Sequence, residues 1–232
     1  MVTNREGVVY DAIVFDHDGV LLGRTPFDTL REAAWDAFER LGETDPDLAH
    51  VDEVAVGVDP ATLTDICERY DLDPVEFWRV RDEVATAAQA DAARAGRKTP
   101  YDDIDALRQL DVPLGIVSSN QQATLDDLLD HFGLADRFHV VYGREPSIVS
   151  LSRKKPSPYY LERALEDLDA TTALFVGDND SDIAAADNAG IDSAFIRRPH
   201  RRSFELSTDP TYELDDLHDL VSLCGRAPVG SP

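Results

Sequence analysis

The chain of 232 residues is poor in cysteine, in lysine and in long apolar runs. Its two cysteines, Cys67 and Cys224, are too few for a disulfide framework and lack the spacing of zinc ligands. No stretch approaches the roughly 18 apolar residues that cross a membrane. The first residues contain no apolar region of the kind found in signal peptides. These absences predict a cytoplasmic protein with reduced thiols.

Positive charge is also scarce. The sequence has 22 lysines and arginines against 46 aspartates and glutamates, which gives a net charge of −24. This charge repels phosphate backbones and anionic lipid headgroups, so neither nucleic acid nor a membrane is an expected partner. Aspartate outnumbers glutamate by 33 to 13, and only three of the cations are lysines. Because dissolved salt screens self-repulsion, we expect a halophilic protein whose folding and activity need high salt.

Five short apolar runs have the length and composition of buried strands. They occupy residues 8–15, 112–117, 138–142, 173–176 and 193–196. Segments of helical periodicity separate the last four runs, at residues 125–132, 159–168 and 182–189. This alternation predicts an α/β fold with a Rossmann-like parallel sheet that is covered by helices on both faces.

The region between residues 22 and 99 interrupts the alternation, because it contains no convincing strand. It is predicted to be an all-α insertion, residues 22–99, in the α/β core, which comprises residues 1–21 and 100–225. Three helices are expected to begin where a capping residue precedes proline, at Thr25-Pro26, Asp59-Pro60 and Asp73-Pro74. Residues 226–232 are expected to be a disordered tail.

Acidic residues follow two of the predicted strands. Asp16 and Asp18 follow the first strand, and Asp178, Asp180 and Asp182 follow the fourth. Because the carboxyl ends of parallel strands meet at one edge of a sheet, these side chains should converge. Several carboxylates at one point require a cation, and their hard oxygens suit Mg²⁺. The residues after Asp18 lack the further acidic ligands of a calcium loop.

Two other residues at this edge are candidates for binding an anion. Ser118 ends the second strand, where its hydroxyl and nearby backbone N–H groups could hold phosphate oxygens. Lys155 precedes the helix predicted at residues 159–168, and its retention in an arginine-rich chain suggests a need for a compact charge. Lys154 is expected in a solvated loop. Because the two lysines are adjacent, however, the sequence alone does not decide which of them binds the anion.

Together these motifs resemble the haloacid dehalogenase superfamily, in its phosphatase branch. The resemblance is carried by Asp16-x-Asp18-Gly19, Ser118, Lys155-Pro156-x-Pro158 and Gly177-Asp178-x-x-x-Asp182. It covers about residues 8–196, and the helical insertion resembles the cap that closes over the site in that superfamily. The resemblance implies an enzyme that hydrolyses small phosphate esters, such as phosphoglycolate or a sugar phosphate.

The resemblance also implies roles for individual residues. Asp16 resembles the nucleophile that forms an aspartyl-phosphate, and Asp18 resembles the general acid and base. Ser118 and Lys155 resemble the groups that hold the transferring phosphoryl.

The metal ligands implied by the resemblance are Asp16, the backbone carbonyl of Asp18 and Asp178, with Asp182 near the metal or its waters. These four acids carry a total charge of −4 when ionised, whereas Mg²⁺ and Lys155 together contribute +3. This charge count predicts that the metal-free site binds metal and favours a protonated Asp18.

Substrate specificity is expected to depend on the insertion and on the loop that follows Asp18. Arg24 is a candidate for contacting an anion of the substrate, and Arg79 and Arg81 are weaker ones. Phe77 and Trp78 are expected to belong to the core of the insertion. The sequence carries no signal for an oligomeric state.

Single sequence features distinguish the proposed phosphatase from most of the alternative functions. A sugar-phosphate mutase would use the same residues and stays an alternative. A catalytically silent binding module would be expected to have lost Asp16, Asp18 or Lys155. The acidic residues argue against a dehalogenase. A phosphonate-cleaving enzyme needs a lysine in the cap, and Lys98 lies only at its exit. Response-regulator domains are about half as long.

Overall fold

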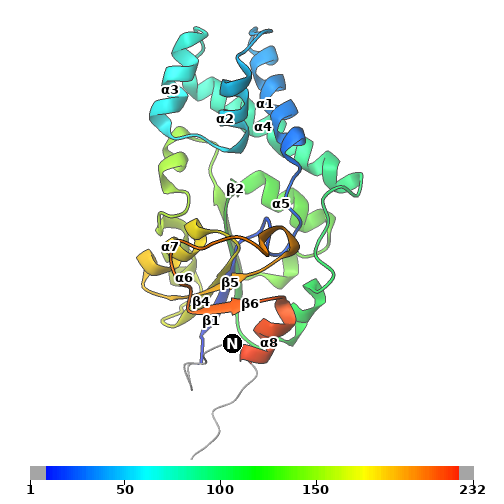
Figure 1. Cartoon of the computed structure of the whole chain (residues 1–232), viewed down its shortest axis with the longest axis vertical. Coiled ribbons are helices and arrows are strands. Elements are labelled where there is room, and N and C mark those ends of the chain that lie inside the picture. Colours follow the sequence, from blue (N-terminus) through cyan, green and yellow to red (C-terminus); the bar gives the residue numbers. More distant parts are fainter. Residues whose placement is uncertain (1–8, 225–232) are drawn as a thin grey trace, which may run out of the picture.

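The structure, a computed structural model, describes residues 9–224 and contains one sheet of six parallel strands (Figure 1). The strands are β1 (Ala12–Phe15), β2 (Leu114–Gln121), β3 (Val140–Arg144), β4 (Ala173–Gly177), β5 (Asp192–Ile196) and β6 (Tyr212–Leu214). Their order in the sheet is β3-β2-β1-β4-β5-β6. Strand β1 therefore lies between β2 and β4, so that the residues following these three strands are neighbours.

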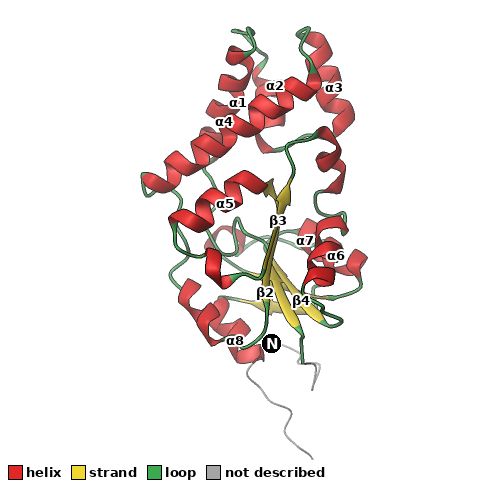
Figure 2. Cartoon of the chain, turned by 180° about the vertical axis from the view of Figure 1, so that it is seen from behind, coloured by secondary structure: helices red, strands yellow, loops and turns green. Residues whose placement is uncertain are grey.

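Helices cover both faces of the sheet, as Figure 2 shows. On one face α5 (Gln122–His131), α8 (Leu217–Cys224) and the 3₁₀ helix Ile104–Gln109 pack against Ile13 and Phe15 of β1. On the other face α6 (Tyr159–Asp167) and α7 (Asp180–Ala189) pack against Val14. Successive residues of a strand point to opposite faces, which is why β1 is apolar throughout. The predicted Rossmann-like α/β fold is confirmed.

Four helices occupy the insertion: α1 (Phe27–Arg40), α2 (Leu48–Val56), α3 (Pro60–Arg69) and α4 (Pro74–Arg94). They enclose a separate apolar cluster that includes Phe38, Phe77 and Trp78. Figure 1 shows this group of helices above the sheet. The sequence predicts three of the four helices, and α2, whose first turn is capped by Asp47, is the one it misses.

Helix starts in the insertion follow the predicted caps at two positions out of three. Asp59 accepts the N–H groups of Ala61 and Thr62, and Asp73 accepts that of Glu76. The expected cap at Thr25 is wrong. Helix α1 begins after Pro26 with no side-chain cap, because the Thr25 hydroxyl is hydrogen bonded to Gln89 and Lys98 instead.

The five predicted strands are present, with ends that differ by a few residues. The sequence misses β6, whose three residues are too few to show a periodicity. Residues 226–232, for which a disordered tail is expected, lie outside the described residues. Within residues 9–224, no helix combines the length and the apolar character that crossing a bilayer requires.

Candidate active site

The register of the central strands positions the candidate nucleophile. Phe15, the last residue of β1, lies opposite Ile116 of β2 and Val176 of β4. Asp16 therefore follows β1 at the level where β2 reaches Ser118 and β4 reaches Asp178. The predicted convergence of the two acidic turns is found at this edge of the sheet.

Lys155 lies inside this group of acidic residues. Its Nζ is 2.7 Å from Oδ1 of Asp16 and 2.6 Å from Oδ1 of Asp182, and all three side chains are buried. Lys154 does not contact Asp16 within hydrogen-bond distance, because its Nζ is directed to the carbonyl oxygen of Val58 in the insertion. Of the two neighbouring lysines, Lys155 is therefore the one at the candidate nucleophile.

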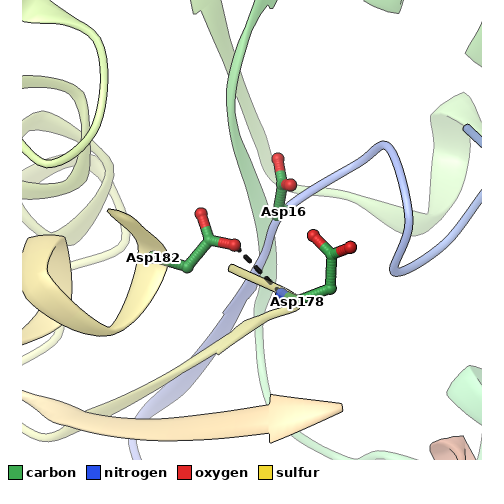
Figure 3. Close-up of side chains that lie close together, drawn as sticks. All are labelled: Asp16, Asp178 and Asp182. Atoms are coloured by element: carbon green, nitrogen blue, oxygen red, sulfur yellow. Dashed lines mark hydrogen bonds between the residues drawn. The ribbon is translucent and has the colours of Figure 1, made fainter. Parts of the chain in front are cut away.

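Two glycines allow the acidic residues to approach one another. Asp182 Oδ2 accepts the backbone N–H of Asp178 at 3.0 Å (Figure 3) and that of Asn179, also at 3.0 Å. A Cβ on Gly177 would lie 2.2 Å from Cβ of Asp182. Gly19 has a φ of +89°, and a Cβ there would lie 2.5 Å from Oδ2 of Asp178. A side chain at either position would displace an acidic residue of the site.

Three carboxylates have the arrangement that a divalent cation requires. One oxygen each from Asp16, Asp178 and Asp182 lie within 4.8 Å of one another, and all three residues are buried (Figure 3). Hard oxygen ligands of this kind fit Mg²⁺. Because Asp182 already accepts two backbone N–H groups and Lys155, Asp16 and Asp178 are better placed to hold the ion directly.

Crowding of these carboxylates changes the protonation of Asp16 in the metal-free protein. Burial raises the pKa of Asp16 to about 7, and the charges of Asp182 and Asp178 add to the increase, although Lys155 opposes it. Near neutral pH, Asp16 is therefore the acid that retains a proton until a cation replaces it.

Asp18 is ionised, so the prediction of a protonated Asp18 is wrong. Burial alone would raise its pKa, but the ammonium of Lys98 and the ring of His17 outweigh burial and hold the pKa well below its usual range. Lys98 is fully buried and donates to Oδ1 of Asp18, while Asn120 Nδ2 donates to Oδ2 at 2.8 Å. The charge count failed because it left out Lys98, which is 80 residues away in the chain.

Lys98 also joins the two connections between the insertion and the core. Its Nζ donates to the carbonyl oxygen of Gly23 at 3.0 Å and to Oγ1 of Thr25 at 3.1 Å. Sequence reasoning placed Lys98 at the exit of the insertion and gave it no role. The scarcity of lysine was the available signal, because Lys98, Lys154 and Lys155 all lie at or beside the site.

His200 and Arg201 are two further residues that the sequence did not indicate. His200 Nε2 is 2.6 Å and Arg201 Nε is 3.1 Å from Oδ2 of Asp178. Burial favours the neutral form of Asp178, but the hydrogen bond from His200 and the charge of Arg201 lower its pKa below the usual value. In the metal-free protein, Oδ2 of Asp178 is therefore hydrogen bonded to both His200 and Arg201.

A cavity of about 270 Å³ lies between the sheet edge and the insertion. Asp16, Asp18, Ser118 and Lys155 line it from the core. Helices α2 and α4 line it from the insertion, and Arg24 lies at its side with an exposed side chain. Two expected residues do not line the cavity: Arg79 pairs with Glu83, and Asp180 accepts the backbone N–H of Ser207.

A known protein family matches most of the chain, including the sheet and the acidic turns. Residues 13–196 match the family of haloacid dehalogenase-like hydrolases. The chain belongs to this family. The hydrolase is 32% identical over 224 residues to a phosphoglycolate phosphatase of Neisseria gonorrhoeae, covering 89% of this chain and 88% of the relative. The expectation of a phosphatase of this superfamily is thereby confirmed.

Other relatives agree with the family and with the fold. The hydrolase is 28% identical to the pyrophosphatase PpaX of Halalkalibacterium halodurans, covering 70% of this chain and 75% of the relative. It shares its fold with the crystal structure of CbbY from Rhodobacter sphaeroides in complex with phosphate, at a TM-score of 0.68 and 20% identity. That likeness covers 91% of this hydrolase and 96% of CbbY.

Proposed function

We propose that this hydrolase is a Mg²⁺-dependent phosphatase of small organic phosphates that works through an aspartyl-phosphate on Asp16. The proposal rests mainly on the position of Asp16, which lies beside Lys155 and the carboxylates of Asp178 and Asp182 at the floor of one cavity. The relatives named for phosphoglycolate and pyrophosphate hydrolysis support a small phosphate as the substrate.

In the first step Asp16 attacks phosphorus, and the bond from phosphorus to the leaving oxygen breaks. Ser118 and Lys155 hold the phosphoryl oxygens while Asp16 approaches in line. Bound Mg²⁺ would neutralise part of the phosphoryl charge, which otherwise repels the carboxylate nucleophile. Asp18 is ionised in the free protein, so it first takes up a proton from the monoprotonated phosphate ester and then passes this proton to the leaving alkoxide.

In the second step water attacks the aspartyl-phosphate, and Asp18 accepts the proton that the water loses. Asp16 is regenerated and inorganic phosphate leaves. Lys98 and Asn120 favour this half of the cycle, because both donate hydrogen bonds to Asp18 and hold it in the ionised form that acts as a base. Residues 22–99 act as the cap, whose helices exclude large substrates and bulk water from the cavity.

The test is hydrolysis of p-nitrophenyl phosphate in about 2 M KCl, with Mg²⁺ or with EDTA. High salt is used because the net charge of −24 predicts a halophilic protein. We expect turnover with Mg²⁺ and a loss of at least about 100-fold with EDTA. Equal rates with and without the metal, in folded protein, would refute the proposal. Phospho-aspartate formation without turnover would indicate a mutase instead.

Asp18→Ala is expected to lower the rate in a manner that depends on the leaving group. Acid–base catalysis contributes about 10²- to 10⁴-fold, and an alkoxide needs a proton more than p-nitrophenolate does. We therefore expect a larger loss of kcat on an alkyl phosphate than on p-nitrophenyl phosphate. Steady-state kinetics on both esters measure the difference, and equal losses would contradict the acid role.

A further inference from the structure

The cavity contains a second group of charged residues, apart from the acidic residues around Asp16. It consists of Arg81 in α4, Arg144 at the end of β3 and Lys154, with Asp82 of α4 between the arginines; the three cations line the cavity. Arg81, Asp82 and Arg144 are all buried. None of these four residues is used by the mechanism above.

Positive charge exceeds negative charge in this group. Arg81 Nη1 is 3.1 Å and Arg144 Nη2 is 2.9 Å from the same oxygen, Oδ1 of Asp82. Lys154 makes no ion pair within 4 Å with any residue of the described part of the chain, and its Nζ donates to the carbonyl oxygen of Val58 at 3.3 Å. The group thus has three cations and one carboxylate, although Asp59 also acts on Lys154 from beyond ion-pair distance.

This excess does not arise from a shortage of acids, since the chain has 46 of them and only 22 lysines and arginines. Buried charge without a partner is costly, because it loses its hydration without a compensating ion pair. Burial together with Arg144 and Arg81 lowers the pKa of Lys154. The two arginines have Asp82 as a partner, whereas Lys154 is half-buried without an ion pair, and an anion bound beside it would offset this cost.

The group lies close to the phosphoryl site through two backbone connections. Lys154 directly precedes Lys155, whose Nζ contacts Asp16, and successive Cα atoms are about 3.8 Å apart. Arg144 Nε donates to the carbonyl oxygen of Ser119, the residue after Ser118. Because both groups also line the same cavity, a small molecule with its phosphate at Asp16 would face the second group with its other end.

We propose that Lys154, Arg144 and Arg81 bind a second anionic group of the substrate, so that the preferred substrate is a small phosphate ester that also carries a carboxylate or a second phosphate. This inference rests on the proposed function. The inference predicts that phospho-carboxylates or bisphosphates are better substrates than sugar monophosphates, whose second end is uncharged. It also corrects the expectation that Lys154 lies in a solvated loop.

A purely structural role accounts for part of the group only. Arg81 donates to two backbone carbonyl oxygens at the end of α2, and the ion pair between Asp82 and Arg144 links the insertion to the core. It does not explain Lys154, whose ammonium contributes nothing to that ion pair. A substitution of Lys154 therefore distinguishes binding of a second anion from a purely structural role.

The experiment compares four esters at one salt concentration with Mg²⁺: phosphoglycolate, 1,2-ethanediol bisphosphate, 2-hydroxyethyl phosphate, whose second group is an uncharged hydroxyl, and p-nitrophenyl phosphate. We expect kcat/KM for one or both doubly anionic esters to exceed that for 2-hydroxyethyl phosphate by at least about 10-fold, the usual effect of a charge-assisted contact. The first two esters distinguish carboxylate from phosphate recognition.

Lys154→Met is expected to reduce this preference by about 10-fold or more, mainly through KM. Arg153→Met is the matched control on the same segment, because the Arg153 guanidinium lies over the Tyr159 ring and pairs with Glu145. The control should keep the preference within about twofold. Suppose that the wild type turns over p-nitrophenyl phosphate but has the same kcat/KM for the doubly anionic esters and for 2-hydroxyethyl phosphate. This result would overturn the inference and leave the proposed function intact.

Calorimetry with the Asp16→Asn variant and Mg²⁺ tests the inference without turnover. Tighter binding of a doubly anionic ester than of 2-hydroxyethyl phosphate, lost on adding Lys154→Met, supports the second anion site even if every ester fails to turn over. Equal affinities for the doubly anionic ester and for 2-hydroxyethyl phosphate would refute the second anion site.

Discussion

Asp16→Asn is expected to lower kcat by roughly 10⁴-fold or more, because the essential nucleophile is lost. Asparagine has nearly the same shape as aspartate, and its amide oxygen can still accept the hydrogen bond from Lys155 Nζ, 2.7 Å from Asp16. The amide cannot form the acyl phosphate through which we propose the reaction proceeds. Hydrolysis of p-nitrophenyl phosphate with Mg²⁺ measures the loss, and turnover at the wild-type rate would refute the nucleophile assignment.

The same substitution should stabilise the metal-free protein at high pH. The folded-state pKa of Asp16, about 7, is above the ordinary value of 3.8. Between these values the folded state binds more protons at this residue than the unfolded chain does, so its contribution to stability falls as pH rises through this window. The asparagine of the variant has no such titration, because an amide does not ionise in this range.

Thermal unfolding in EDTA at about pH 5 and pH 8 checks this linkage. We expect Asp16→Asn to lose less stability than the wild type between the two pH values. Mg²⁺ should raise the melting temperature of the wild type more than that of the variant, because the variant lacks one carboxylate ligand. A steeper pH dependence in the variant than in the wild type would contradict the assignment of the raised pKa to Asp16.

The sheet could be predicted because parallel strands buried on both faces are apolar throughout. Strands β1, β2, β4 and β5 each give a compact apolar run that ends in a polar turn. Strand β6 could not be predicted, because its three residues alternate with an exposed Glu213 and carry little signal. The missed helix α2 has apolar residues on several sides, so its periodicity is weak.

The acidic part of the site was predictable for the same reason, since Asp16 and Asp178 directly follow buried strands. The cations and amides that act on these acids come from distant segments. Lys98 reaches Asp18 from the end of the insertion, and His200 and Arg201 reach Asp178 from the segment after β5. Their proximity depends on the tertiary fold, so no local pattern reports it. The expectation of a protonated Asp18 was therefore wrong, and the raised pKa of Asp16 was not predicted.

Lys155→Met should reduce both activity and stability. Its ammonium lies between Asp16 and Asp182, with Nζ to oxygen distances of 2.7 and 2.6 Å, and the side chain is 5% exposed. Removing a buried partner leaves uncompensated charge and costs about 3–5 kcal/mol. Loss of a charge that stabilises the transferring phosphoryl lowers kcat by about 10²- to 10³-fold. Urea unfolding in EDTA and p-nitrophenyl phosphate kinetics measure the two effects.

The double variant Asp16→Asn/Lys155→Met separates charge from packing as the cause of the instability. At a pH above the pKa of Asp16, where its carboxylate is ionised, Lys155→Met should cost less free energy of unfolding in the Asp16→Asn background than in the wild type if uncompensated carboxylates are responsible, because one of the two is then already neutral. If the lost lysine stem is responsible, the cost should be the same in both backgrounds. Mg²⁺ should restore stability to Lys155→Met, since the cation supplies the positive charge that the lysine provided between Asp16 and the residues after β4.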